Sequence, residues 1–507
     1  GRAVRQGHAE GERGLMADTV VVGGGINALT AAAFLTRSGR KVVLCEARDV
    51  LGGLAAREEF HPGFHAPGVM HDAAGARREL LAPLALEEHG LAWRTDTPPL
   101  LVTDGERSTL LDPARGAYAA WRERIAPFRA IAARMLDERP PNVASASLAD
   151  AWEIARTALR VRRLGARDML ELARIAPMPV ADWLRECFAH EAERAGLAAT
   201  ALIGTTVGPR AAGTSATLLL REGAAGPEPR GGPAALADAL AGVCRAEDVE
   251  LRTSARVERI RVERGAVTGV QLAGGETIDA PVVLSSIDFR TTVLDLLEPP
   301  VVPLELESAA RAWKTRGALA AVRLALDAPP SLGEAVERAV TVGSLDELER
   351  AADHLKYGTL PDAPWLDVRV PSVADPSLAP AGKATVSVLI HCAPHDLAGG
   401  WDDAARERLG AAVLSGLERV APGTRDKLLA SQVLTPADLE ERYGLAGGHV
   451  FHGEHALDQL WFQRPALSSA RYATPIAGLF LCGSASHPGG CFLGGPGVLG
   501  AAAVIEA

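Results

Sequence analysis

Long apolar runs are missing from this chain. The longest stretches, such as residues 195–204, stop well short of the roughly 18 apolar residues that a bilayer-crossing helix needs. Aromatic residues make up only 4% of the chain, and the formal net charge of -10 is spread along it without a basic run or an acidic tail. No membrane-spanning segment is therefore predicted, and a polyanionic partner such as nucleic acid gains no electrostatic support.

Paired cysteine motifs are also lacking. The spacing of the cysteines shows neither a Cys-x-x-Cys pair nor a zinc-type pattern, which favours reduced thiols and a cytoplasmic location. The six cysteines are Cys45, Cys187, Cys244, Cys392, Cys482 and Cys491. Residues 1–16 are polar and lack the apolar middle of a secretion signal, so we expect a leader or added sequence there, with Met16 as a candidate start.

What the chain does have is an alternation of strand-like and helix-like segments. With 507 residues, 48% of them apolar and 23% charged, it has the composition of a globular protein of roughly two to four domains. The alternation predicts an α/β fold. Residues 79–220 differ, because their Ala, Leu, Arg and Glu content predicts a separate layer of long amphipathic helices.

A strand, turn and helix over residues 18–39 carry a dinucleotide-binding motif. Gly23, Gly25 and Ala28 form Gly-x-Gly-x-x-Ala at the turn. In such motifs the first glycine permits the tight turn, the second lets the backbone approach a pyrophosphate, and the third small residue packs the helix on the strand. The helix start offers free N–H groups to the phosphates. Glu46 ends the next predicted strand, where a carboxylate accepts both ribose hydroxyls. A purely steric need for glycine does not account for all of these features together.

Two further glycine clusters bear on which dinucleotide is bound. Gly52 and Gly53 suit a backbone that passes close to a long cofactor, which favours FAD over NAD, with an ordinary loop as the alternative. Residues 495–500 also match Gly-x-Gly-x-x-Gly, but the chain has only seven more residues and no room for a second strand. We therefore expect residues 495–500 to direct a helix start toward the flavin or its phosphates.

Three ordered motifs carry a family resemblance. Residues 20–53, 229–270 and 478–502 together resemble the phytoene-dehydrogenase-like branch of the FAD-dependent amine oxidase superfamily. Residues 447–465 look most like the pyridine nucleotide-disulphide oxidoreductase-domain-containing group. The likeness extends over essentially the whole chain from Asp18.

The resemblance implies a discontinuous Rossmann-like FAD-binding domain and a mixed α+β substrate domain, with non-covalent FAD. The FAD domain would comprise 17–85, 222–300 and 465–507, and the substrate domain 86–221 and 301–464. The expected cofactor contacts, from the motifs and the resemblance together, are Gly23, Gly25, Asn27, Ala28, Glu46, Ala47, Gly52, Gly53, Leu54, Val257, Gly483, Ser484, Gly497 and Val498. Most amine-oxidising relatives have an arginine directly after the second glycine pair, where this chain has Leu54.

Oxidation of a C–H bond by flavin needs a hydride acceptor and, for desaturation, a base. The candidate catalytic residues are His487, His71, His452 and Glu454, with His487 the first choice because it lies between two motifs expected to flank the flavin. For each histidine the alternative is a bond to a backbone carbonyl. The spacing of His449, His452 and His455 suggests a metal, but neighbouring glycines argue against a helix presenting them together, and no metal is predicted.

The leading hypothesis is a dehydrogenase or desaturase that acts on an apolar or partly conjugated small molecule and passes electrons to oxygen or a quinone. An amine oxidase is the alternative, although residues 317–327, the expected counterpart of the strand that bears a lysine in such enzymes, offer only Arg323. A non-catalytic FAD-binding partner in a biosynthetic complex is a further alternative. Peripheral membrane contact rests on family analogy. Trp461, Phe462, Tyr472 and Phe492 are candidates for the walls of an apolar pocket, with core packing as the alternative.

Overall fold

A five-stranded parallel sheet forms one half of the molecule. The computed structural model describes residues 15–143, 148–333 and 337–507. In spatial order the strands of this sheet are β18 (Leu479–Leu481), β12 (Val282–Ser285), β2 (Thr19–Val22), β3 (Val42–Cys45) and β8 (Glu250–Arg252). The βαβ unit predicted from residues 18–46 lies at its centre. All five strands fall within the three segments expected to form the FAD domain, whose boundaries stay a prediction.

Both faces of this sheet are covered. Alternate strand residues point to opposite faces, so Val21 and Leu44 pack toward helices while Val20 and Val43 pack toward a second sheet. The helices are α1 (Ile26–Arg37), α10 (Gly232–Ala246) and α17 (Gly495–Glu506), whose alanine-rich buried faces allow close packing. The second sheet has the order β1 (Leu15–Met16), β11 (Thr277–Asp279), β10 (Ala266–Leu272) and β9 (Val257–Glu263).

Strand β1 of the second sheet falls within residues 1–16, the segment expected to be a leader. Leu15 and Met16 pair in parallel with Ile278 and Asp279, whereas residues 1–14 of the same expected segment lie outside the described residues.

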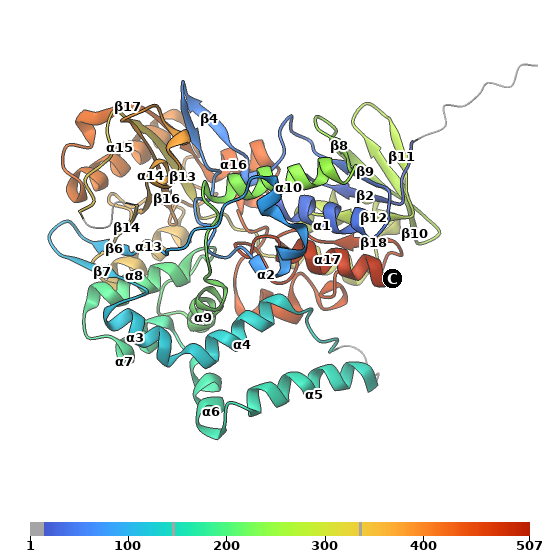
Figure 1. Cartoon of the computed structure of the whole chain (residues 1–507), viewed down its shortest axis with the longest axis horizontal. Coiled ribbons are helices and arrows are strands. Elements are labelled where there is room, and N and C mark those ends of the chain that lie inside the picture. The colour runs from blue at the N-terminus through green and yellow to red at the C-terminus, as the bar shows by residue number, and fades with distance from the viewer. Residues whose placement is uncertain (1–14, 144–147, 334–336) are drawn as a thin grey trace, which may run out of the picture.

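A seven-stranded mixed sheet forms the other half, on the left in Figure 1 where β2 and β12 lie on the right. In spatial order its strands are β17 (Leu428–Leu434), β13 (Ala320–Leu326), β16 (Ala384–Ile390), β15 (Asp367–Arg369), β14 (Arg338–Thr341), β6 (Leu100–Thr103) and β7 (Ser108–Leu111). A separate hairpin consists of β4 (Glu58–His61) and β5 (Phe64–Ala66).

Strands β6 and β7 differ from the prediction of a purely helical layer over residues 79–220. They form a hairpin around the turn at Asp104 and Gly105, and β6 pairs in parallel with β14. The hairpin is short, and its place in the sheet depends on a partner more than 230 residues away, so local composition does not reveal it.

Helices fill the layer below the seven-stranded sheet, and α5 and α6 extend away from the rest of the molecule (Figure 1). The remaining helices are α2 (Arg78–Leu81), α3 (Gly116–Arg124), α4 (Ala126–Asp137), α5 (Leu148–Arg162), α6 (Ala166–Ile175), α7 (Val180–Cys187), α8 (Glu191–Leu202), α9 (Thr214–Ala224), α11 (Phe289–Leu294), α12 (Leu304–Ala312), α13 (Leu345–Tyr357), α14 (Pro371–Ala374), α15 (Asp403–Val420) and α16 (Pro436–Tyr443). Among the described residues, no helix combines the length and apolar character needed to cross a bilayer.

Candidate functional site

The loops that follow four parallel strands meet at one edge of the five-stranded sheet. These loops begin at Gly23 after β2, Glu46 after β3, Ser286 after β12 and Cys482 after β18. Their backbones are tied together, because the Gly23 N–H donates to the Cys45 carbonyl at 2.8 Å and the Ser286 N–H donates to the strand β2 backbone at 2.9 Å. The carboxyl edge of an open parallel sheet is where such folds bind ligands.

The two glycine pairs predicted from the sequence lie against each other at this edge. The Gly52 N–H donates to the Gly24 carbonyl at 2.8 Å, and Gly25 and Gly52 form a parallel bridge. Gly52 has a φ of 108°, and a Cβ built on Gly53 would lie 3.1 Å from the Gly25 Cα. A side chain is therefore disfavoured at Gly52 and at Gly53, which lets the backbone of this loop pass close to the first glycine turn and to a ligand.

Glu46 closes the same cradle. Its side chain is 8% exposed, and its carboxylate accepts from the Gly24 N–H at 2.6 Å and from the Arg48 N–H at 2.8 Å. Each carboxylate oxygen has a further lone pair, so Glu46 can still accept hydroxyl groups. Helix α1 begins directly after Gly25, with no side-chain cap and no acidic residue in its first turn. These features fit the ribose and the pyrophosphate of an adenine dinucleotide.

A continuous cavity runs from this cradle to the seven-stranded sheet. At the cradle it is lined by nine residues expected from the sequence, namely Gly23, Gly25, Asn27, Glu46, Gly52, Gly53, Leu54, Ser484 and His452. Its apolar wall comprises Leu100, Leu111, Leu197, Ile203, Leu389, Val450, Phe451 and Phe492. Its charged and phenolic lining also includes Arg48, Asp72, Tyr118, Arg122, Arg221, Glu222, Asp288, Arg338, Asp367 and Tyr443.

Several expected cofactor contacts lie outside the cavity lining. Ala28 is buried in α1, and Ala47 is exposed. Val257 is buried between the two sheets of this half, two residues beyond Ala255, whose N–H donates to the Glu46 carbonyl. Gly483 packs against Ser286, since a Cβ there would lie 2.4 Å from the Ser286 carbonyl oxygen.

Gly497 and Val498 belong to the packing of α17. Gly497 faces the Asn27 backbone on α1, and Val498 packs on the helical core. The helix start is held in place nearby, where the Gly494 N–H donates to Asn27 Oδ1 at 3.1 Å.

His487, the first-choice base, lies beside a different cavity. Its Nε2 is 2.7 Å from the Met135 carbonyl oxygen, and its own carbonyl accepts from the Tyr472 hydroxyl. Burial lowers the pKa of His487 to about 4. The cavity that it lines is apolar and includes Trp461 and Phe462. The geometry favours the interpretation of His487 as a histidine bonded to a backbone carbonyl.

The segment around His452 and Glu454 is tightly packed. Glu454 accepts from Arg316 Nε at 2.7 Å and from the Thr206 hydroxyl at 3.0 Å, and it does not line the cavity. Burial lowers the pKa of His449 to about 3 and the pKa of His452 to about 4. Among the described residues, no group of three or more His, Cys, Asp or Glu side chains is placed to hold a metal ion.

Arg464 was not identified from the sequence and organises this segment. Its side chain is fully buried, and its guanidinium donates to the backbone carbonyls of Phe451, Gly453, Glu454, Gln459 and Ser484. Burial lowers the pKa of Arg464 to about 9. The arginine therefore ties the loop that carries His452 to the loop after β18.

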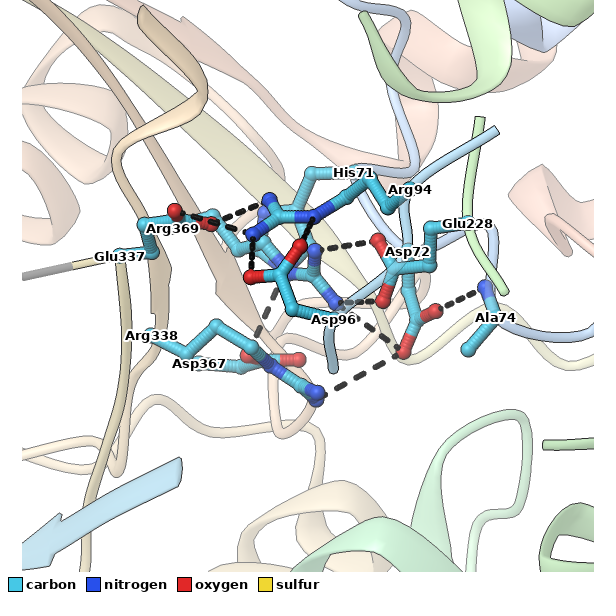
Figure 2. A network of polar contacts seen from close by, with 10 residues as sticks. All are labelled: His71, Asp72, Ala74, Arg94, Asp96, Glu228, Glu337, Arg338, Asp367 and Arg369. Atoms are coloured by element: carbon cyan, nitrogen blue, oxygen red, sulfur yellow. Dashed lines mark hydrogen bonds and ion pairs between the residues drawn. The ribbon is translucent and has the colours of Figure 1, made fainter. Parts of the chain in front are cut away.

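A polar network borders the far end of the cavity (Figure 2). His71 Nε2 lies 3.3 Å from Asp367, and His391 Nε2 lies 3.5 Å from the other oxygen of the same carboxylate. Burial alone would raise the pKa of Asp367, but the two histidines outweigh it and hold the pKa well below its ordinary value. Thus His71, another candidate base, is placed behind Asp367, which lines the cavity itself.

The neighbouring charges in this network are paired. Arg369 makes a bidentate salt bridge with Glu228 at 2.7 and 2.9 Å. Asp72 lies between Arg338 and Arg369, at 3.8 and 3.7 Å. No local sequence signal marks Asp367 or Asp72, because their partners come from distant segments.

The comparisons with known proteins agree with this architecture. Residues 29–495 match the model of the family described as flavin containing amine oxidoreductase. The chain is 31% identical to pyridine nucleotide-disulfide oxidoreductase domain-containing protein 2 of Rattus norvegicus, over 95% of this chain and 92% of that protein. It is 31% identical to a neurosporene-forming phytoene desaturase of Cereibacter sphaeroides, over 54% of this chain and 52% of the desaturase.

A solved structure of a redesigned putrescine oxidase superposes with a TM-score of 0.63, covering 97% of this chain and 98% of the oxidase at 15% identity. The fold is thus the same, and the family match spans most of the sequence. This chain belongs to the flavin-containing amine oxidoreductase family and is an FAD-dependent oxidoreductase.

Proposed function

We propose that this chain is a dehydrogenase or desaturase. It would transfer a hydride from a C–H bond of an apolar or partly conjugated small molecule to N5 of FAD. The observation that carries the proposal is the single cavity that joins the dinucleotide cradle to an apolar wall in the other half of the molecule. FAD supplies the hydride acceptor. The chain's own residues hold the substrate in place and exclude water. Oxygen or a quinone would then take up the electrons.

Desaturation also requires a proton acceptor, and Asp367 meets the geometric requirements. It lines the cavity, it is ionised, and each of its oxygens contacts a buried histidine. In this proposal Asp367 takes the proton, and His71 acts as a positioning residue that holds the carboxylate in place. His71 is itself fixed by a 3.0 Å contact between its Nδ1 and the Ser387 hydroxyl.

An amine oxidase is the second candidate, and the same carboxylate favours it. An ionised Asp367 would attract a cationic amine as well as a proton, and a putrescine oxidase shares the fold. Against it, Arg323 occupies the strand β13 position considered for a lysine, and its guanidinium is bound to Glu58 at 2.9 Å and to Gln432 at 3.0 Å. Arg323 also does not line the cavity.

The test is anaerobic reduction of the bound flavin in the purified holoenzyme. A panel would contain conjugated polyenes and cyclic hydrocarbons in detergent, together with primary amines and diamines. Bleaching of the flavin by hydrocarbons supports the proposal, whereas bleaching by amines alone overturns it in favour of amine oxidation. If flavin stays bound but nothing in a broad panel reduces it, a non-catalytic FAD-binding partner becomes the better account.

Asp367→Asn separates the two roles of this carboxylate. If Asp367 is the proton acceptor, the variant lowers the rate constant of flavin reduction, while substrate affinity is retained. If Asp367 binds an amine, the variant weakens substrate affinity instead. Asp353→Asn, on the exposed face of α13, is the matched control and should change neither quantity.

A further inference from the structure

Residues 286–288, which follow β12, lie between the two ends of the FAD cradle. A Cβ built on Gly23 would come within 3.1 Å of Ile287 Cγ2, which places this loop against the first glycine turn. On the other side the loop contacts Gly483, and the Cys482 N–H donates to the Ser285 carbonyl at 2.7 Å. The loop is therefore part of the wall that a dinucleotide would pass.

Asp288 is the last residue of this loop, and only one of its two carboxylate oxygens has a hydrogen-bond partner among the described residues. Its Oδ1 accepts from the Arg290 N–H at 2.8 Å and the Thr291 N–H at 3.1 Å, which caps helix α11. Asp288 Oδ2 is buried and has no hydrogen-bond partner among the described residues. The residue is only 1% exposed and lines the cavity. A buried polar atom without a partner is costly, so the site calls for a bound group that can pair with it.

His452 presents a second unused atom on the same wall. It lines the cavity, and its ring faces the Ile287 backbone, next to Asp288. Its Nδ1 is buried without a partner among the described residues. A neutral imidazole that donates from one nitrogen accepts at the other. The wall therefore offers one acceptor from His452 and, when Asp288 carries a proton, one donor.

We propose that protonated Asp288 and neutral His452 together bind a hydroxyl-bearing part of FAD, either the ribityl chain or a ribose. A hydroxyl group both donates and accepts, so neighbouring hydroxyls match this pair. The negative charge of the pyrophosphate favours a neutral Asp288 over an ionised one. Asp288 is thus assigned a cofactor-binding role in addition to its helix cap, and His452 contacts the cofactor instead of serving as the base.

The charged surroundings allow Asp288 to stay neutral. Among the described residues it makes no salt bridge, and the charges that face it are Arg290 and Asp295 of its own helix and Arg464 from the loop before β18. The Arg464 guanidinium is already occupied by backbone carbonyls. Burial raises the pKa of Asp288 to about 7, so the carboxyl group would change its charge near neutral pH.

The experiment measures the dissociation constant of FAD for the apoprotein, by flavin fluorescence, at pH values from about 6 to about 8.5. For the wild type, we expect affinity to fall by about tenfold or more over this range, because ionised Asp288 can no longer donate. Asp288→Asn keeps the helix cap and a permanent donor, so its affinity should match the low-pH wild type and vary little with pH.

Two further variants distinguish the loss of a cofactor contact from misfolding of the protein. Asp288→Ser keeps the cap but removes the second polar atom, and we expect weak binding at every pH. His452→Leu should weaken binding by about tenfold without removing the pH dependence. A wild-type affinity that does not vary with pH would overturn the proposal. So would an Asp288→Asn variant with the wild-type slope, or an Asp288→Ser variant that binds FAD as the wild type does at low pH.

Discussion

Gly497 of the last helix lies directly against the Asn27 backbone of the first. A Cβ built on Gly497 would come within 2.3 Å of the Asn27 carbonyl oxygen and 2.9 Å of Thr30 Cβ. The C-terminal helix can pack on α1 at this distance only because position 497 has no side chain. The glycine in the motif at 495–500 therefore serves helix packing beside the cofactor cradle.

Gly497→Ala should destabilise the protein by about 2 kcal/mol or more, because the added methyl group must push α17 away from α1. Thermal and urea unfolding of the variant would measure this. Gly410→Ala is the control, since a Cβ at Gly410 in α15 would meet only Val433 Cγ2 at an ordinary 3.5 Å. The control should be neutral or slightly stabilising through its helix propensity. Equal stability of the two variants would contradict the packing argument.

Glu46→Gln should weaken FAD binding by about tenfold, since an amide offers fewer acceptor sites than the carboxylate that we expect to accept from the ribose hydroxyls. The amide oxygen can still accept from the Gly24 N–H, and only the bond from the Arg48 N–H is lost, so the fold should be retained. Titration of the apoprotein with FAD measures the loss. Glu59→Gln, an exposed acid whose carboxylate accepts from the Gly63 N–H, is the matched control. Unchanged affinity in Glu46→Gln would remove Glu46 from the cofactor site.

Arg464→Met should cost about 3 kcal/mol or more, because it leaves several buried carbonyl oxygens without donors. Arg464→Lys should recover only part of this loss, since an ammonium group has fewer donors and a different geometry. Urea unfolding and FAD affinity would be measured together. The control is Arg210→Met, an exposed arginine paired with Asp346. A loss no larger than that of the control would show that Arg464 does not hold the loops together.

Asp288 predicts a pH dependence of apoprotein stability. Its ordinary pKa of 3.8 is raised to about 7 in the folded protein. The folded state therefore binds a proton more tightly than the unfolded state, and this contribution to stability is full below pH about 4 and is lost as pH rises through about 7.

Asp288→Asn removes this dependence. The variant should match the wild type near pH about 4 and exceed it by at least about 1 kcal/mol near pH about 8, because each pKa unit corresponds to about 1.4 kcal/mol. Urea unfolding at the two pH values tests this. Asp353→Asn on α13, which is paired with Lys356 and remote from Asp288, should show no such divergence. A variant that is less stable than the wild type at both pH values would refute the expectation.

His487→Gln should leave the rate of flavin reduction within about threefold of the wild type, with the fastest substrate found in the reduction panel. The amide can replace the bond to the Met135 carbonyl, and the residue lines the second cavity instead of the one that reaches the FAD cradle. A fall of about a hundredfold with FAD still bound would instead restore His487 as the base.

The βαβ unit of the FAD-binding half was predictable because its determinants are consecutive. A buried strand, a glycine turn and an alanine-rich helix follow one another within residues 18–46. The acidic residue at position 46 stands out because it ends the next predicted strand. The glycine pair at 52 and 53 was predicted to pass close to the cofactor. Its contact with Gly24 and Gly25 is in keeping with that prediction.

The remaining site residues required the tertiary structure. The role of Asp367 depends on His71, almost 300 residues earlier in the chain. The role of Arg464 depends on backbone carbonyl groups of two loops that the tertiary structure brings together around it. Residue type alone did not distinguish the four candidate catalytic residues, three histidines and one glutamate. Their burial and hydrogen bonds in the structure did. Local sequence determined where the chain turns and where the first helix begins, because those properties depend on backbone conformation. The fold alone decided which side chains are charged, paired or left open to a ligand, because desolvation and electrostatic pairing depend on neighbours that sequence separation conceals.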